Sequence, residues 1–173
     1  MKLLLTSFAT WLPHQKSNAA DDLLQIIERE NKHNCYYLRQ LPVDTEKASQ
    51  RAIATIKEIK PSAIICCGMA ESRYKLTIES NARCEQDCIQ TTVNLPQLIS
   101  CLSNTSISHD AGQFVCEGLY YHILNYLKNI KNINIAIPCI FVHVPILTNS
   151  NQSIIVHDFE CILDFIKKAT NNW

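Results

Sequence analysis

Short, continuous apolar runs alternate along the chain with longer segments in which apolar residues recur every three or four positions. The first pattern is typical of strands buried on both faces, and the second of amphipathic helices. Strands are therefore predicted at 2–8, 35–43, 62–68, 74–82 and 133–147, and helices at 20–33, 45–59, 114–130 and 157–170. Residues 83–107 carry the weakest pattern, and only a short helix around 96–101 is predicted there.

The predicted helices have polar residues where helices normally begin. Asn18 precedes the first helix, and Asp44 or Thr45 precedes the second, which Pro61 limits. Strands that alternate with helices indicate an α/β fold. We expect one domain over 1–173, built on an open, mostly parallel, twisted sheet with helices on both faces.

The predicted strand at 74–82 differs from the others because its residues alternate in character. Leu76 and Ile78 fall on one face, and Thr77 and Glu79 on the other. A strand of mixed exposure is expected, and Glu79 is either a functional carboxylate or an ordinary solvent-facing one.

The composition excludes several classes of function. The 173 residues include 16 basic and 16 acidic side chains, so a net charge of zero gives no electrostatic basis for binding nucleic acid. No apolar stretch approaches the about 18 residues of a membrane span. The opening residues resemble a signal peptide, but Thr6, Ser7 and Thr10 dilute the apolar run, which favours a buried first strand.

Nine cysteines are present, and several of them (Cys66, Cys67, Cys139) lie within apolar runs, where a free thiol behaves as a small hydrophobe. This usage suits a reducing cytoplasm better than a disulfide scaffold. Cys84 and Cys88 have CxxxC spacing and Cys101 follows, but no second ligand pair completes a zinc site. Ordinary loop thiols are favoured over a metal centre.

Glycine is scarce, so its positions are informative. With only three glycines, the chain contains neither a GxGxxG sequence nor a P-loop. Gly68 ends an apolar run at the edge where open α/β sheets bind ligands. Gly112 and Gly118 bracket Cys116, near the start of a helix, where free N–H groups favour a thiolate and could hold an oxyanion. The alternative, a core thiol at Cys116, is equally consistent with the pattern.

His143 ends a buried apolar strand, at the same edge of the predicted sheet as the start of the Cys116 helix. A rim histidine in this position often has only a structural role. By itself the pattern favours that structural role; the alternative is that His143 meets Cys116 as general base to nucleophile, with Glu79 a candidate to orient the imidazole.

Four segments of the chain resemble a known family in the family's own order. AGQFVCEG looks like the nucleophile segment of the pyroglutamyl peptidase I (pyrrolidone-carboxylate peptidase) family of cysteine peptidases. FVHVPIL looks like the family's histidine segment, GMAESRYKLTIES like its glutamate segment and LLLTSFATWLP like its N-terminal segment. The resemblance implies a cytoplasmic thiol peptidase that removes N-terminal pyroglutamate from peptides and needs no metal or organic cofactor.

The resemblance also assigns roles to individual residues. It makes Cys116 the nucleophile, His143 the base and Glu79 the orienting carboxylate, and it places Phe8 and Trp11 in the pyrrolidone pocket. Three departures are that Leu12-Pro13 replaces a Gly-Gly pair, Met69 stands in place of a substrate-side glutamine, and Ser80 replaces an arginine.

The segment between Glu79 and Cys116 is shorter than is usual in the family and lacks a loop that carries an arginine near the oxyanion. Arg83 lies too close to Glu79 in sequence to be assigned that role. Low activity is therefore expected. The alternatives are a thiol amidohydrolase for another small acyl substrate and a catalytically silent binding protein; homo-oligomerisation is left open.

Overall fold

A computed structural model describes residues 2–130 and 137–171 of the chain. Within these ranges the main sheet has six strands in the spatial order β2–β1–β3–β8–β4–β7. Their bounds are β1 (Leu3–Phe8), β2 (Cys35–Leu41), β3 (Ala63–Met69), β4 (Leu76–Glu79), β7 (Thr105–Ser108) and β8 (Cys139–Val144). A separate hairpin is formed by β5 (Asn81–Cys84) and β6 (Asp87–Gln90).

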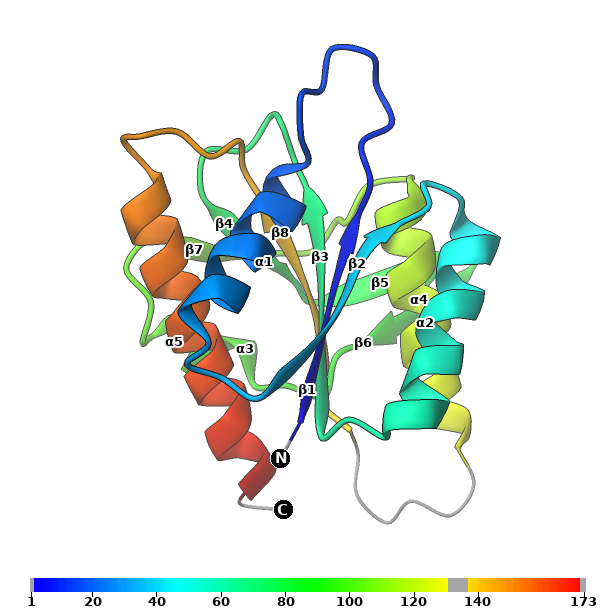
Figure 1. The fold of residues 1–173 in the computed structure, drawn as a ribbon. Helices are drawn as coiled ribbons and strands as arrows, with labels where there is room; N and C mark the ends of the chain where they lie inside the picture. Colours follow the sequence, from blue (N-terminus) through cyan, green and yellow to red (C-terminus); the bar gives the residue numbers. More distant parts are fainter. Residues whose placement is uncertain (1, 131–136, 172–173) are drawn as a thin grey trace.

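Helices cover both faces of the sheet (Figure 1). On one face α1 (Ala19–Glu30) and α5 (Gln152–Asn171) pack with α3 (Leu95–Ile99) nearby, and on the other lie α2 (Thr45–Ile59) and α4 (Val115–Asn129). The buried apolar residues accordingly form two clusters, one between each helical layer and the sheet. The predicted fold class, an open and mostly parallel α/β sheet, is confirmed.

Two helix starts are capped as the sequence predicts. The side chain of Asn18 accepts a hydrogen bond from the Ala20 N–H at 3.0 Å, and Asp44 accepts one from the Lys47 N–H at 2.9 Å. These bonds satisfy N–H groups that have no partner within the helix.

Strand direction changes at the centre of the sheet. β1 pairs with β2 and β3, and β3 with β8, all in parallel, whereas β4 runs antiparallel to β8. The register joins Gly68 to His143 on one side of β8, and Thr77 to His143 on the other. Since directly paired residues share a face of the sheet, Gly68, Thr77 and His143 all face α4.

Several predicted boundaries were wrong. The prediction of a strand over 133–147 holds only for Cys139–Val144, and 131–136 lie outside the described residues. The last helix begins at Gln152 rather than at 157, and the region 83–107 contains strands as well as the short helix. β4 is buried along its whole length rather than of mixed exposure, so Glu79 is not a solvent-facing carboxylate.

No helix in the described ranges is long and apolar enough to cross a membrane.

Candidate active site

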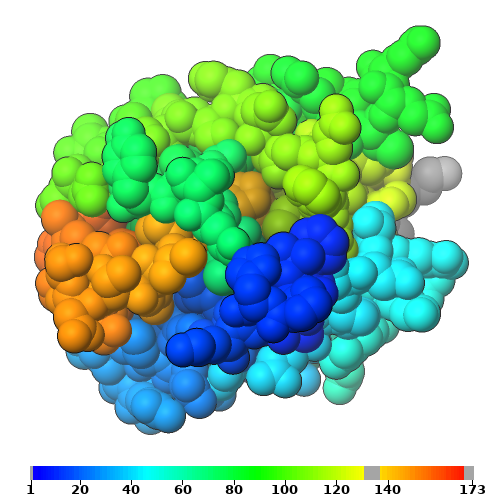
Figure 2. All heavy atoms as spheres, turned by 90° about the horizontal axis from the view of Figure 1, so that it is seen from above, coloured from blue at the N-terminus to red at the C-terminus, as the bar shows by residue number. Residues whose placement is uncertain are grey.

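A cavity of about 940 Å³ opens where the carboxyl ends of β1, β3 and β8 meet the start of α4. Ligands of open α/β folds bind at this edge of the sheet. The loop after β1 and the loop after β3 meet at its rim, where the Gln15 amide donates a 2.6 Å hydrogen bond to Glu71 (Figure 2). Cys116, His143 and the three expected substrate-side residues, Phe8, Trp11 and Met69, all line the cavity.

His143 and Glu79 form a buried pair. The Nδ1 of His143 lies 2.7 Å from Oε1 of Glu79, and the two side chains are 6% and 0% exposed. They meet because β4 runs antiparallel to β8, which places Glu79 opposite Phe141, one step along the same face from His143. With Nδ1–H donating to the carboxylate, the lone pair of a neutral imidazole lies on Nε2, which is the arrangement that a general base requires.

The environment keeps Glu79 charged. Burial alone would raise the pKa of Glu79, but hydrogen bonding from His143, Ser108 and Arg73 outweighs burial and holds the pKa below the usual 4.5. Arg73 donates from Nη1 to Oε1 of Glu79 at 2.7 Å. A single oxygen of the carboxylate therefore has two hydrogen-bond donors, the His143 ring and the Arg73 guanidinium.

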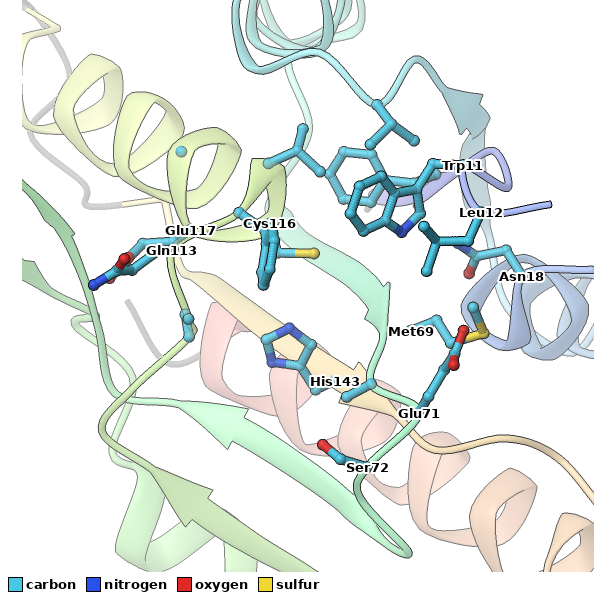
Figure 3. Close-up of a pocket in the computed structure, with 18 of the residues that line it drawn as sticks. Trp11, Leu12, Asn18, Met69, Glu71, Ser72, Gln113, Cys116, Glu117 and His143 are labelled. Atoms are coloured by element: carbon cyan, nitrogen blue, oxygen red, sulfur yellow. The ribbon is translucent and has the colours of Figure 1, made fainter. Parts of the chain in front are cut away.

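Cys116 is the second residue of α4, as the sequence predicts. The first hydrogen bond of this helix runs from the Gly118 N–H to the Phe114 carbonyl, so the N–H groups of 115–117 precede the helical ladder. The sulfur faces Gly68: a Cβ built on that glycine would lie 2.6 Å from Sγ. Figure 3 shows Cys116 and His143 facing the same space from α4 and β8.

No hydrogen bond joins Cys116 to His143 among the contacts of the described residues, so the direct bond expected between nucleophile and base is not present in this structure. Catalytic hydrogen bonds often tighten only when a substrate is bound. Burial raises the pKa of Cys116 to about 12, and nearby Cys66 and Glu79 add to the effect. The expectation that the helix start favours a resting thiolate is therefore wrong: the structure favours a neutral thiol.

The three expected substrate-side residues differ in their surroundings. Phe8 is only 2% exposed and forms part of the apolar floor, whereas Trp11 is 54% exposed and packs against Phe114 with ring centroids 5.8 Å apart. Met69 turns toward α1, where its sulfur accepts a 3.2 Å hydrogen bond from the Ala19 N–H. The site thus has an aromatic wall and a floor without a charged group.

Sequence reasoning missed two residues that line this cavity at its charged and aromatic sides. Arg73 and Phe114 both lie in segments that carry the family resemblance, yet neither was assigned a role. The sequence carried a signal for Phe114, because it is an aromatic residue two positions before the candidate nucleophile. For Arg73 the sequence offered no signal apart from its place in the glutamate segment. Arg83, which the sequence left without a role, also lines the cavity.

The three cysteines considered as metal ligands lie outside the lining of the cavity. Cys84, Cys88 and Cys101 are free and exposed, and in the described part of the chain no group of three or more His, Cys, Asp or Glu side chains could hold a metal ion.

Two curated relatives of this chain are both named pyrrolidone-carboxylate peptidase. The chain is 26% identical to pyrrolidone-carboxylate peptidase 1 of Caldanaerobacter subterraneus subsp. tengcongensis and 28% identical to the pyrrolidone-carboxylate peptidase of a Thermoanaerobacter species. Each alignment covers 85% of this chain and 83% of the relative. No family model matches the sequence.

Solved structures agree in fold. A mutant pyrrolidone carboxyl peptidase from Pyrococcus furiosus superposes with a TM-score of 0.82 at 18% identity, covering 98% of this chain and 99% of that one. Pyroglutamyl peptidase I from Bacillus amyloliquefaciens gives 0.77 at 19% identity, covering 93% and 92%.

The chain shares its α/β fold with solved structures of peptidases, and its curated relatives are named as peptidases. Within that class it resembles the pyroglutamyl peptidase I family in both sequence and structure, so the resemblance drawn from the four segments is confirmed.

Proposed function

We propose that this chain is a cysteine exopeptidase that removes N-terminal pyroglutamate from peptides, with Cys116 as nucleophile, His143 as base and Glu79 as the orienting carboxylate. The observation that carries the proposal is the buried 2.7 Å bond between Glu79 and His143 Nδ1, which leaves Nε2 for a cavity that Cys116 also lines. The names of the relatives support the same substrate class.

The raised pKa of Cys116 defines how the reaction begins. Because the resting thiol is neutral, its proton passes to His143 Nε2 as the sulfur attacks the acyl carbonyl of the pyroglutamyl residue. The imidazolium that forms is stabilised by Glu79, which remains charged. Free N–H groups at the start of α4 stabilise the oxyanion.

The second half of the reaction returns the enzyme to its starting state. His143 gives its proton to the leaving amine as the C–N bond breaks, which leaves pyroglutamate on the sulfur as a thioester. Water then loses a proton to His143 and attacks the thioester, and the thiol of Cys116 is restored as pyroglutamate leaves.

The substrate ring fits the apolar part of the cavity. A lactam is small, flat and uncharged, and the side chains of Phe8, Trp11 and Met69 provide apolar surface beside the thiol. We propose slow turnover, since the segment between Glu79 and Cys116 lacks the loop arginine implied by the family resemblance. Loss of one oxyanion donor typically lowers the rate by about 10²–10³.

The partner is thus a peptide with an N-terminal pyroglutamyl residue, and neither nucleic acid nor a membrane is expected to bind. A cytoplasmic location agrees with the free cysteines among the described residues. Cell fractionation would test this location, and sedimentation would determine the oligomeric state. The single domain over 1–173 also remains a prediction.

The test compares three proteins on two substrates. Wild type, Cys116→Ala and a matched thiol control, Cys101→Ala at an exposed position outside the cavity, are assayed on pyroglutamyl and on unblocked aminoacyl chromogenic substrates. Pyroglutamyl cleavage by wild type and Cys101→Ala, absent in Cys116→Ala, is expected. Equal background in all three would favour a silent binding protein, and preference for another acyl group would favour the amidohydrolase.

A further inference from the structure

Arg73 has contacts that a substrate-side or surface arginine would not need. It lies in the loop between β3 and β4 at the edge of the cavity, with a side chain that is 25% exposed. Its Nη1 donates to Oε1 of Glu79 at 2.7 Å and also to the hydroxyl of Thr77, the residue paired with His143. The guanidinium is therefore turned toward the strand pair rather than toward solvent.

The other end of the guanidinium reaches the segment that leads to the nucleophile. Nη2 donates to the carbonyl oxygen of Asp110 at 3.0 Å and approaches the hydroxyl of Ser108 at 3.4 Å. Asp110 lies two residues before Gly112, whose φ of +85° redirects the chain into α4. Arg73 thus joins the carboxylate of the candidate triad to the loop that carries Cys116.

The carboxylate itself shows why a second donor matters. Oε1 of Glu79 accepts from both His143 and Arg73, whereas Oε2 is buried with no hydrogen-bond partner within the described structure. A carboxylate with one bonded oxygen can rotate about its last bond, and two donors on the same oxygen remove that freedom. The fork of an arginine is rigid enough to fix such an arrangement.

On the basis of the proposed function, we infer that Arg73 is a positioning residue: it holds Glu79 in the rotamer that receives His143 and ties that pair to the loop before Cys116.

The test uses Arg73→Gln, Arg73→Lys and a control, Arg51→Gln, which removes the same charge from an exposed position on α2. Arg73→Gln is expected to lower kcat about tenfold to a hundredfold with KM changed less than about threefold. Arg73→Lys, which keeps the positive charge but loses the rigid fork of donors, should restore part of kcat, and Arg51→Gln should behave as wild type.

A second readout does not depend on peptidase activity. The surroundings of the His143 ring can be followed by NMR at a fixed pH, with its signal assigned by loss in a His143→Gln variant. In Arg73→Gln this signal should shift or broaden, because Glu79 is no longer fixed against the ring, whereas Arg51→Gln should leave it unchanged; thermal unfolding reports whether the fold is retained. If wild type cleaves no substrate but the signal changes in Arg73→Gln alone, the proposed function fails and the role of Arg73 stands. A raised KM with unchanged kcat, or an unchanged signal in a folded Arg73→Gln variant, would overturn it.

Discussion

Gly68 is the position at which one added methyl group bears most directly on the proposed chemistry. A Cβ there would lie 2.6 Å from Sγ of Cys116 and 2.8 Å from Cζ of Phe141. Non-bonded heavy atoms are comfortable at about 3.5–4.0 Å, so each neighbour must retreat by about 1 Å. Both neighbours matter, because the Phe141 ring packs against His143 with centroids 4.9 Å apart.

The size of the effect follows from these distances. A displacement of about 1 Å in a reacting atom costs about 10²-fold in rate, which corresponds to about 2.7 kcal/mol of barrier. Overpacking of a filled site costs about 1–3 kcal/mol of unfolding free energy. Gly68→Ala should therefore fold with reduced stability and lose about two orders of magnitude in kcat/KM.

Thermal unfolding and kcat/KM on a pyroglutamyl substrate measure the two losses. The matched control is Gly68→Ala made in a Cys116→Ala background, where the sulfur is gone and only the contact with Phe141 remains. The stability penalty should be smaller in that background, because the two substituted sites are in contact and their effects do not add. Full activity in Gly68→Ala, or equal penalties in both backgrounds, would refute the placement of the sulfur against Gly68.

Three further predictions concern the same region. Gly118→Ala should destabilise the fold although alanine favours helices, because its Cβ would lie 2.4 Å from Cγ2 of Thr45. Adding Thr45→Ser should reduce the clash, since it removes Cγ2 and leaves the hydroxyl oxygen, 2.9 Å from the added Cβ, as the nearest atom. A gain in melting temperature for Gly118→Ala would contradict this packing. Glu79 has a pKa below 4.5 in the folded state, so the folded state binds fewer protons than the unfolded chain and stability falls as the pH drops through that pKa. The melting temperature should therefore decrease less steeply with falling pH in Glu79→Gln than in wild type. Glu79→Gln should also retain more activity than Cys116→Ala. With a pKa of about 12, Cys116 should react with iodoacetamide more slowly at pH 7 than the exposed cysteines, and its labelling rate should rise about tenfold per pH unit above pH 7. Rapid labelling of Cys116 at pH 7, mapped by mass spectrometry, would argue against a neutral resting thiol.

Features set by neighbouring residues could be predicted from the sequence. The caps at Asn18 and Asp44 and the start of α4 before Cys116 depend on a few adjacent side chains, and all three lie where the pattern placed them. The mostly parallel sheet followed from the alternation of strands and helices.

Features that depend on distant contacts could not be predicted in this way. The hairpin formed by β5 and β6 has mostly exposed residues and packs on α4, so it carries no strong apolar pattern of its own. The partners of Arg73 include Asp110, 37 positions away in sequence. The residues alone made Glu79 one candidate to orient His143, and only the family resemblance assigned the pairing, since no local pattern links residues 64 apart.

The alternation of side chains along β8 limits how the sequence of this strand can change in evolution. His143 faces Cys116 because it shares a face with Phe141, whereas Val142 and Val144 point into the opposite apolar cluster. A shift of the strand by one residue would exchange histidine for valine on the catalytic side. Loops away from the site can therefore absorb insertions and deletions, whereas in β8 any change of an odd number of residues turns His143 away from the catalytic side.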